Sequence, residues 1–313
     1  MKLLSNGIEF VYSKKHLLTV FLLFFTLVAC TQQPKQVKNS NTREVVKGNR
    51  ALKSEAKKYG SIVALLMDGK SLCTGTYLGN GFIITALHCV ASHKLTDTDK
   101  PVFTIKAPNE FRSTRESKMD EVEVFIAPSE REILVKGVKT SVDDVALLKF
   151  SGEFGKELEK LTPATVTTNE IKKGETGFYV GGYGFDQFDK SVAAIGLLNI
   201  GKADFKETAV LTGEELKTMT EEEIAELDSV TQTVTLSDYD EKSGFSAILK
   251  GDSGGPLFKL VDDKVVVYGI ASMALFSEDE VATTGKAKNA KNLHSRVDYA
   301  GIREWIECIT SAK

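Results

Sequence analysis

The sequence predicts an all-β protein with one helix at its C-terminus. Short runs of apolar, β-branched and aromatic residues alternate with turn residues from position 61 to position 272. Only two segments carry a helical pattern. Many short strands with few helices are typical of β-sandwiches and β-barrels, so one of these two architectures is expected.

The first 30 residues resemble an export signal rather than part of the fold. Lys14 and Lys15 precede an apolar run from Leu17 to Ala29. That run is shorter than the ~20 residues of a membrane-spanning helix and has the length of a signal-peptide core, roughly 7–15 residues. A buried core helix is the alternative, which the basic residues before the run and the polar residues after it disfavour. The last letters of the segment, LVAC, resemble the lipobox of bacterial lipoproteins, which implies cleavage before Cys30 and acylation of that cysteine.

A polar segment separates this signal from the folded chain. Residues 31–44 contain no aromatic side chain and are rich in Gln, Asn, Lys and Thr, which predicts a flexible tether or propeptide. Folded sequence is therefore expected over residues 45–313. The whole chain has 42% apolar residues, 27% charged residues and a net charge of −3, and this weak acidity argues against nucleic acid as a partner.

The expected strands form two groups along the chain. Each is a short apolar run that contains β-branched or aromatic residues, and turn residues bound most of them. The first group comprises residues 61–67, 81–85, 101–107, 121–127 and 144–150, and the second comprises residues 176–184, 229–236, 256–260 and 264–272.

Two segments are expected to be helical. Residues 211–228 carry two capping-box patterns and many charges, which predicts a solvated surface insertion without an assigned function. Residues 298–310 place Ile302, Trp305, Ile306 and Ile309 at the i, i+3, i+4 and i+7 positions. This spacing gives the C-terminal helix one apolar face.

The stretch KGDSGGPLF, residues 250–258, contains a candidate nucleophile, Ser253. A simple tight turn and the nucleophile elbow of an α/β-hydrolase are alternatives. An elbow is followed by a helix, whereas Ser253 is followed by Pro256 and a strand-like run. His88 and Asp144 lie upstream, so the order His, Asp, Ser is the opposite of the hydrolase order. Only a parallel sheet in the fold would favour the α/β-hydrolase hypothesis again.

Three motifs in this order resemble the catalytic motifs of the trypsin/chymotrypsin-like serine proteases. They are TALHC at residues 85–89, DVALL at 144–148 and GDSGGPL at 251–257, supported by CTGTYL, GGYG and REWIE elsewhere in the chain. The resemblance covers about residues 45–310. It implies two Greek-key antiparallel β-barrels, roughly residues 45–155 and 156–297, with the site between them and the helix 298–310 after them.

The resemblance also implies a catalytic role for each motif. A serine hydroxyl needs a base to remove its proton as it attacks, and His88 is the expected general base and later general acid. Asp144 is expected to orient the His88 imidazole and to stabilise its charged form. The backbone N–H groups of Gly251 and Ser253 are expected to form the oxyanion hole. The implied activity is a serine endopeptidase without metal or cofactor, and the alternative is a catalytically inactive binding lipoprotein that keeps the protease fold.

The four cysteines are expected to have three different states. Cys73 and Cys89 match the disulfide that flanks the catalytic histidine in this family, and a disulfide fits an exported protein. Cys30 is the lipid site. Cys308 is left over on the terminal helix, where we expect a buried free thiol.

The substrate pocket is inferred from the same alignment of motifs. Ala247, six residues before the nucleophile, falls at the base of the primary pocket, and Ser272, Met273 and Ala274 match the segment that binds substrate backbone. Asn292 falls near another pocket position. Without a carboxylate at Ala247 a buried Lys or Arg of the substrate would be unpaired, so a small or medium apolar P1 residue is expected. Protein or peptide substrates and protein protease inhibitors are the implied partners.

The segment VVKGN at residues 45–49 resembles the new N-terminus that activates proteases of this family. Cleavage between Glu44 and Val45 would free an ammonium group that pairs with Asp252. Because Cys30 lies before the cut, the same cleavage would release the enzyme from the membrane. We therefore expect an exported, lipid-anchored protein that cleavage near Glu44 converts to a soluble form.

Overall fold

The computed structural model describes most of the compact unit that extends from Thr42 to Lys313. The signal 1–30 with Cys30, the tether 31–44, Val45 and the charged segment 211–228 lie outside the described residues. Within the described residues, no helix combines the length and the apolar character that crossing a bilayer requires. The described residues are 49–50, 58–67, 71–91, 102–107, 117–118, 122–127, 132–135, 138–141, 144–172, 174–185, 196–203, 207–208, 234–238, 246–275 and 291–311.

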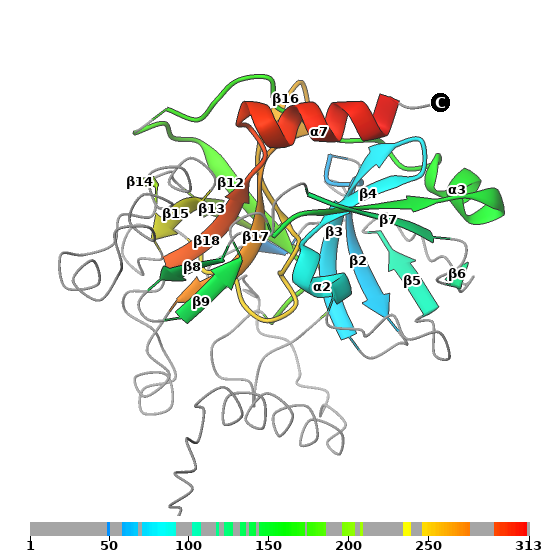
Figure 1. Ribbon diagram of the computed structural model, residues 1–313, viewed down its shortest axis with the longest axis horizontal. Helices are drawn as coiled ribbons and strands as arrows, with labels where there is room; N and C mark the ends of the chain where they lie inside the picture. Colours follow the sequence, from blue (N-terminus) through cyan, green and yellow to red (C-terminus); the bar gives the residue numbers. More distant parts are fainter. Residues whose placement is uncertain are drawn as a thin grey trace, which may run out of the picture. The chain divides into compact units, whose positions relative to one another are not determined.

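The first sheet has seven strands, and its centre is a Greek key (Figure 1). Strands β2, β3 and β4 follow one another as antiparallel neighbours, and β5 returns to pair with β2. The resulting order β5-β2-β3-β4 is the Greek-key order. The strands of this sheet are β2 (Ile62–Met67), β3 (Ser71–Gly79), β4 (Phe82–Thr85), β5 (Val102–Lys106), β6 (Ser117–Lys118), β7 (Val122–Ile126) and β10 (Ala146–Phe150).

Among the described residues, the second sheet has nine strands. Four of them form a second Greek key, in which the returning strand comes before the other three in the chain instead of after them. Strands β16, β17 and β18 follow one another, and β15, which precedes them in the chain, pairs with β18. Its strands are β1 (Asn49–Arg50), β11 (Thr165–Val166), β12 (Phe178–Gly182), β13 (Asn199–Ala203), β14 (Glu207–Thr208), β15 (Val234–Asp238), β16 (Pro256–Val261), β17 (Lys264–Leu275) and β18 (Lys291–Arg296). A separate hairpin joins β8 (Glu132–Val135) to β9 (Val138–Ser141). The predicted double β-barrel is therefore correct.

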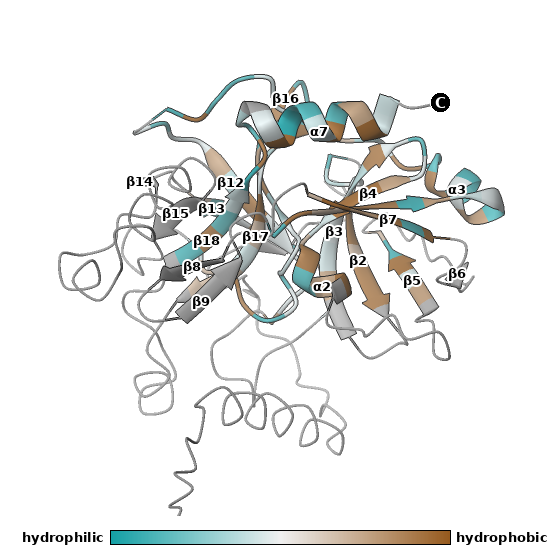
Figure 2. Ribbon diagram, viewed as in Figure 1, coloured by the Kyte–Doolittle hydropathy of each residue, from teal (hydrophilic) through white to brown (hydrophobic). Residues whose placement is uncertain are grey.

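Three described helices complete the fold: α2 (Leu87–Ala91), α3 (Gly152–Leu158) and α7 (Ala300–Ser311). The predicted C-terminal helix thus begins two residues later than expected and ends one residue later. Ile302 and Ile306 are buried in the same apolar cluster as the strands of the first sheet, and Trp305 and Ile309 pack against that cluster. Figure 2 shows hydrophobic residues on α7 and the hydrophobic colouring of β2 and β4.

Both ends of the chain cross the predicted boundary between the two halves at residue 155. The first described strand, β1, pairs with β13 of the second sheet, so Asn49 lies opposite Ile200. Helix α7, at the far end of the chain, buries Ile302 and Ile306 in an apolar cluster that contains residues of both sheets. Both ends of the described chain therefore help to join the two halves.

Several strands that the sequence pattern did not predict have clear physical reasons. Strand β3 contains Gly75, where a Cβ atom would lie 2.6 Å from Cγ2 of Ile83, so glycine is required although it weakens a strand pattern. Strand β18 has the sequence KNLHSR and reads as a polar loop, yet residues 292–296 are all buried. Asn292 of this strand bonds the backbone of Ser246 and Ile248, which are distant in sequence and so do not enter a local pattern.

Candidate active site

His88 and Asp144 are brought together by the pairing of two neighbouring strands. Strand β4 ends at Thr85, strand β10 begins at Ala146, and these two residues are direct partners in the antiparallel ladder. Because the end of one strand lies beside the start of the other, the residues just outside the ladder also meet. The Nδ1 atom of His88 lies 2.6 Å from Oδ2 of Asp144, and the His88 backbone N–H donates to Oδ1 at 2.8 Å.

The Asp144 carboxylate is buried, but hydrogen bonds and the neighbouring imidazole compensate for its desolvation. Only 2% of its side chain is exposed, whereas the His88 side chain is 46% exposed. Burial by itself raises the pKa of Asp144, but the hydrogen bonds and charge of the His88 ring, the His88 amide and the Ser272 hydroxyl together hold it below its ordinary value. The carboxylate therefore stays ionised near neutral pH and orients an imidazole whose other edge reaches solvent.

Ser272 supplies the third contact of this carboxylate, and it comes from the second sheet. The register of β17 against β18 shifts between Ala271 and Met273, so Ser272 sits in a bulge. Bulges redirect side chains, and the Ser272 hydroxyl donates to Oδ2 of Asp144 at 2.7 Å. The sequence placed Ser272 only in the substrate-binding segment, because nothing in the local sequence indicates the bulge.

Ser253 lies in a glycine-rich loop that is anchored to both sheets. The Ser253 carbonyl accepts the Thr74 N–H at 2.8 Å, and the Gly254 N–H donates to the Ala271 carbonyl at 2.7 Å. Gly254 has a positive φ of 83°, and a Cβ atom there would lie 2.1 Å from the Thr85 hydroxyl. Glycine is thus required at this position by both its backbone angle and the space around it.

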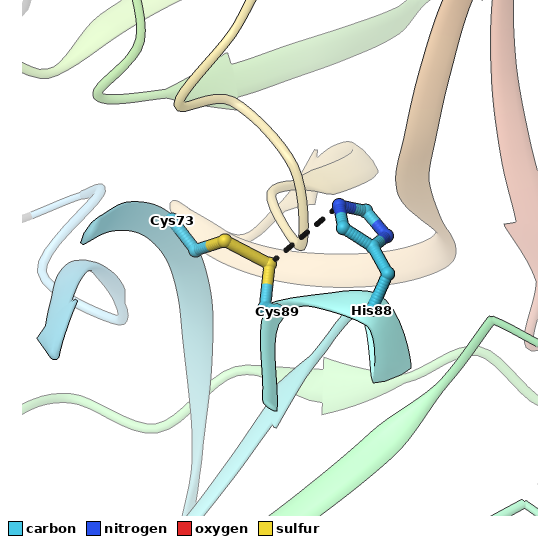
Figure 3. A group of neighbouring side chains, drawn as sticks. All are labelled: Cys73, His88 and Cys89. Atoms are coloured by element: carbon cyan, nitrogen blue, oxygen red, sulfur yellow. Dashed lines mark hydrogen bonds between the residues drawn. A yellow bond between two sulfur atoms is a disulfide. The ribbon is translucent and has the colours of Figure 1, made fainter. Parts of the chain in front are cut away.

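The disulfide between Cys73 and Cys89 lies beside His88 (Figure 3). The Sγ atom of Cys89 is 3.9 Å from Nε2 of His88 and 3.7 Å from the Ser253 carbonyl oxygen. Within the described part of the chain, no hydrogen bond joins the Ser253 hydroxyl to His88. Catalytic hydrogen bonds commonly tighten only when substrate binds.

The predicted cysteine pairing is confirmed, and one prediction about Cys308 is wrong. Cys73, His88 and Cys89 lie close enough to suggest a metal-binding cluster, but the disulfide leaves neither sulfur available as a thiolate ligand. Cys308 is a free thiol as expected, but it is exposed rather than buried. It lies two positions beyond Ile306 on α7 and so faces away from the buried stripe.

Asp252, the residue before the candidate nucleophile, is a fully enclosed acid. Its carboxylate accepts the N–H groups of Gly184 at 2.7 Å and Leu249 at 2.8 Å. A Cβ atom at Gly182 would lie 2.1 Å from Oδ1, so the GGYG segment is shaped to make room for this side chain. Burial raises the pKa of Asp252 to about 7, because the two N–H groups offset only part of the desolvation.

The residues predicted to line the substrate pocket lie near the loop but differ in exposure. Ala247 is completely buried, whereas Met273 and Ala274 of β17 are partly exposed. Asn292 is buried behind the Ala247 segment. Its Oδ1 atom accepts the Ile248 N–H at 2.8 Å, and its Nδ2 group donates to the Ser246 carbonyl at 2.7 Å. Asn292 thus braces the backbone on both sides of Ala247.

The raised pKa of Asp252 predicts that stability depends on pH. From about pH 4, the ordinary carboxyl pKa, up to about 7, the folded chain keeps a proton on Asp252 that the unfolded chain has lost. The free energy of unfolding therefore falls as the pH rises through this window. Urea unfolding at about pH 5 and about pH 8 should show a larger fall for the unprocessed wild type than for the non-titrating variant D252N. Equal falls in the two proteins would contradict the prediction.

Comparison with known proteins agrees with this geometry. The model of the Trypsin family matches residues 51–294, a stretch that contains His88, Asp144 and Ser253. No curated protein matches the chain significantly. Because the family match spans well over half of the chain and the fold is the double β-barrel, the chain belongs to the trypsin family.

Proposed function

We propose that this protein is a serine endopeptidase in which Ser253 is the nucleophile, His88 the general base and Asp144 the group that orients His88. The observation that carries the proposal is the buried Asp144 carboxylate, 2.6 Å from the His88 ring, in a trypsin-family fold. An ionised, buried carboxylate is suited to stabilising the imidazolium that forms when His88 takes a proton.

The proposed reaction cleaves a peptide bond in two steps. The Ser253 hydroxyl attacks the substrate carbonyl carbon while His88 removes its proton, and the N–H groups of Gly251 and Ser253 stabilise the resulting oxyanion. His88 then protonates the leaving amine, which leaves an acyl group on Ser253. Water, deprotonated by His88, attacks this acyl-enzyme and releases the acid product. Gly251 supports the proposal because its φ of 102° gives the loop a backbone angle that glycine readily adopts.

We propose a preference for substrates with a small or medium apolar P1 residue. Ala247 is buried and carries no charge, so a Lys or Arg side chain placed against it would be desolvated without a partner. Met273 and Ala274 offer apolar surface on the partly exposed face of β17.

We also propose that cleavage between Glu44 and Val45 activates the enzyme. Strand β1 begins at Asn49 and pairs with β13, whose other neighbour, β12, contains Gly182 beside the Asp252 carboxylate. Four residues of extended chain span about 14 Å, so an ammonium group on Val45 is within reach of Asp252. Such a pair would remove the energetic penalty of a buried, unpaired carboxylate.

We propose that the precursor is exported and anchored to a bacterial membrane. The lipid on Cys30 would anchor the precursor, and cleavage at Glu44 would free the protease domain from it. The membrane-attached form would therefore be the inactive form.

The catalytic proposal predicts selective labelling of Ser253. A fluorophosphonate probe should modify the wild type and not S253A, because the probe reacts with an activated serine. D144N should lower kcat by about 10⁴-fold, since the imidazole would be held in the wrong tautomer. D263N is a matched control, because the Asp263 side chain is 72% exposed and pairs only at the surface with Lys58. An unlabelled, processed wild type would favour the inactive binding protein instead.

The specificity proposal predicts the outcome of a peptide-library profile. Cleavage after Ala, Val, Leu or similar residues should exceed cleavage after Lys or Arg, because a cationic side chain would lack a carboxylate partner. The informative variant is A247D, which should raise cleavage after Lys and Arg relative to the wild type. A wild-type profile dominated by Lys and Arg would sink the proposal.

The activation proposal predicts the N-terminus and activity of two forms. N-terminal sequencing should find the soluble form starting at Val45, with high activity, and the membrane-bound form carrying the lipid at Cys30, with low activity. D252N should abolish the gain in activity on processing, because it removes the charge that pairs with the new ammonium group. A lipidated chain with residues 30–44 attached and full activity would rule out this mechanism.

A further inference from the structure

Thr74 of β3 lies where the first sheet meets the loop that carries Ser253. Its side chain is completely buried. The Thr74 backbone N–H donates to the Ser253 carbonyl at 2.8 Å, and its hydroxyl donates to the Gly251 carbonyl at 2.9 Å. One residue of the first sheet therefore holds the carbonyl groups at both ends of the Gly251–Asp252–Ser253 backbone.

The same hydroxyl also accepts a hydrogen bond, so it acts as a donor and as an acceptor at the same time. The Tyr183 N–H donates to Oγ1 of Thr74 at 3.0 Å. Tyr183 belongs to the segment whose next residue, Gly184, donates to the Asp252 carboxylate. The Thr74 hydroxyl thus bridges the segment beside Asp252 and the loop itself, and its orientation is fixed by a donor on one side and an acceptor on the other.

Thr74 is linked to the histidine side of the site as well. The Thr85 hydroxyl, at the end of β4 and three residues before His88, donates to the Thr74 carbonyl at 2.8 Å. Gly254 packs into the same place, since a Cβ atom there would lie 2.2 Å from the Thr74 carbonyl oxygen. The chain segments that carry the base and the nucleophile are therefore both bonded to Thr74.

We propose that Thr74 is a positioning residue for the oxyanion hole, acting through the Gly251 and Ser253 carbonyl groups. This role rests on the serine endopeptidase activity proposed above. The two expected oxyanion donors are the N–H groups of Gly251 and Ser253, and the carbonyl groups that Thr74 bonds belong to the same two residues. The Thr74 hydroxyl and N–H therefore restrict rotation of the backbone at both donor residues.

The contribution of the hydroxyl can be isolated with two matched pairs of side chains. Thr and Val have nearly the same shape, as do Ser and Ala, and each pair differs by the hydroxyl group. T74V and T74A remove the donor to Gly251 and leave the buried Tyr183 N–H without its acceptor, whereas T74S keeps both hydrogen bonds. Thr76 is a built-in control on the same face of β3, because it is equally buried and its hydroxyl has no partner among the described residues.

The experiment measures kcat and KM per titrated active site, together with the rate of fluorophosphonate labelling. It uses the form of the chain, full-length or processed, in which the wild type is labelled. Removal of one oxyanion donor lowers kcat by about 10²–10³-fold in other proteases, so misalignment by T74V and T74A should lower it by about 10–100-fold. KM should change little, T74S should retain most of the activity, and T76V should match the wild type.

Each outcome decides the role of Thr74. If T74V fails to fold, the comparison of T74S with T74A still isolates the hydroxyl. If the variants without a hydroxyl keep the wild-type kcat, or if T74S loses as much as T74A, the positioning role is wrong even though the protease activity stands. A wild type that no fluorophosphonate labels in either form would overturn both the proposed function and this role.

Discussion

The Asp144 carboxylate lies where three separate segments of the chain meet, and its hydrogen bonds set the geometry of the site. It accepts hydrogen bonds from the backbone and ring of His88, which follows β4, and from Ser272 in the bulge of β17. The first contacts come from the first sheet and the last from the second. A buried charge without these donors would be costly, so the bonding that keeps Asp144 ionised also holds the two sheets in register beside His88.

Two buried acids near the site have pKa values that are shifted in opposite directions. Hydrogen bonds and the imidazole overcome the desolvation of Asp144 and lower its pKa. The same penalty is only partly offset at Asp252, whose two partners are neutral backbone N–H groups, and its pKa rises to about 7. In the proposed mechanism the first acid would stabilise the imidazolium that forms on His88. The second would pair with the ammonium group that the proposed processing frees.

The loop that carries Ser253 has little regular secondary structure of its own, so its shape comes from its surroundings. Thr74 holds its carbonyl groups, Ala271 of β17 bonds Gly254 and Gly255, and the disulfide at Cys89 touches the Ser253 carbonyl. These contacts come from both sheets. A loop built in this way is held by contacts from both barrels, which is the preorganisation that the proposed oxyanion site needs.

The sequence by itself determined the β class and the positions of half of the described strands, because short apolar runs bounded by turn residues are local properties. Motif order predicted His88, Asp144 and Ser253 as the site residues, and resemblance supplied the Cys73–Cys89 pair. Only the tertiary structure decided that polar β18 is a buried strand, that β1 joins the second sheet and that Ser272 binds Asp144. Thr74 was not singled out by the sequence, because its three partners Gly251, Tyr183 and Ser253 are distant along the chain. Such features escape a sequence pattern because each depends on contacts between segments that only the folded chain places together.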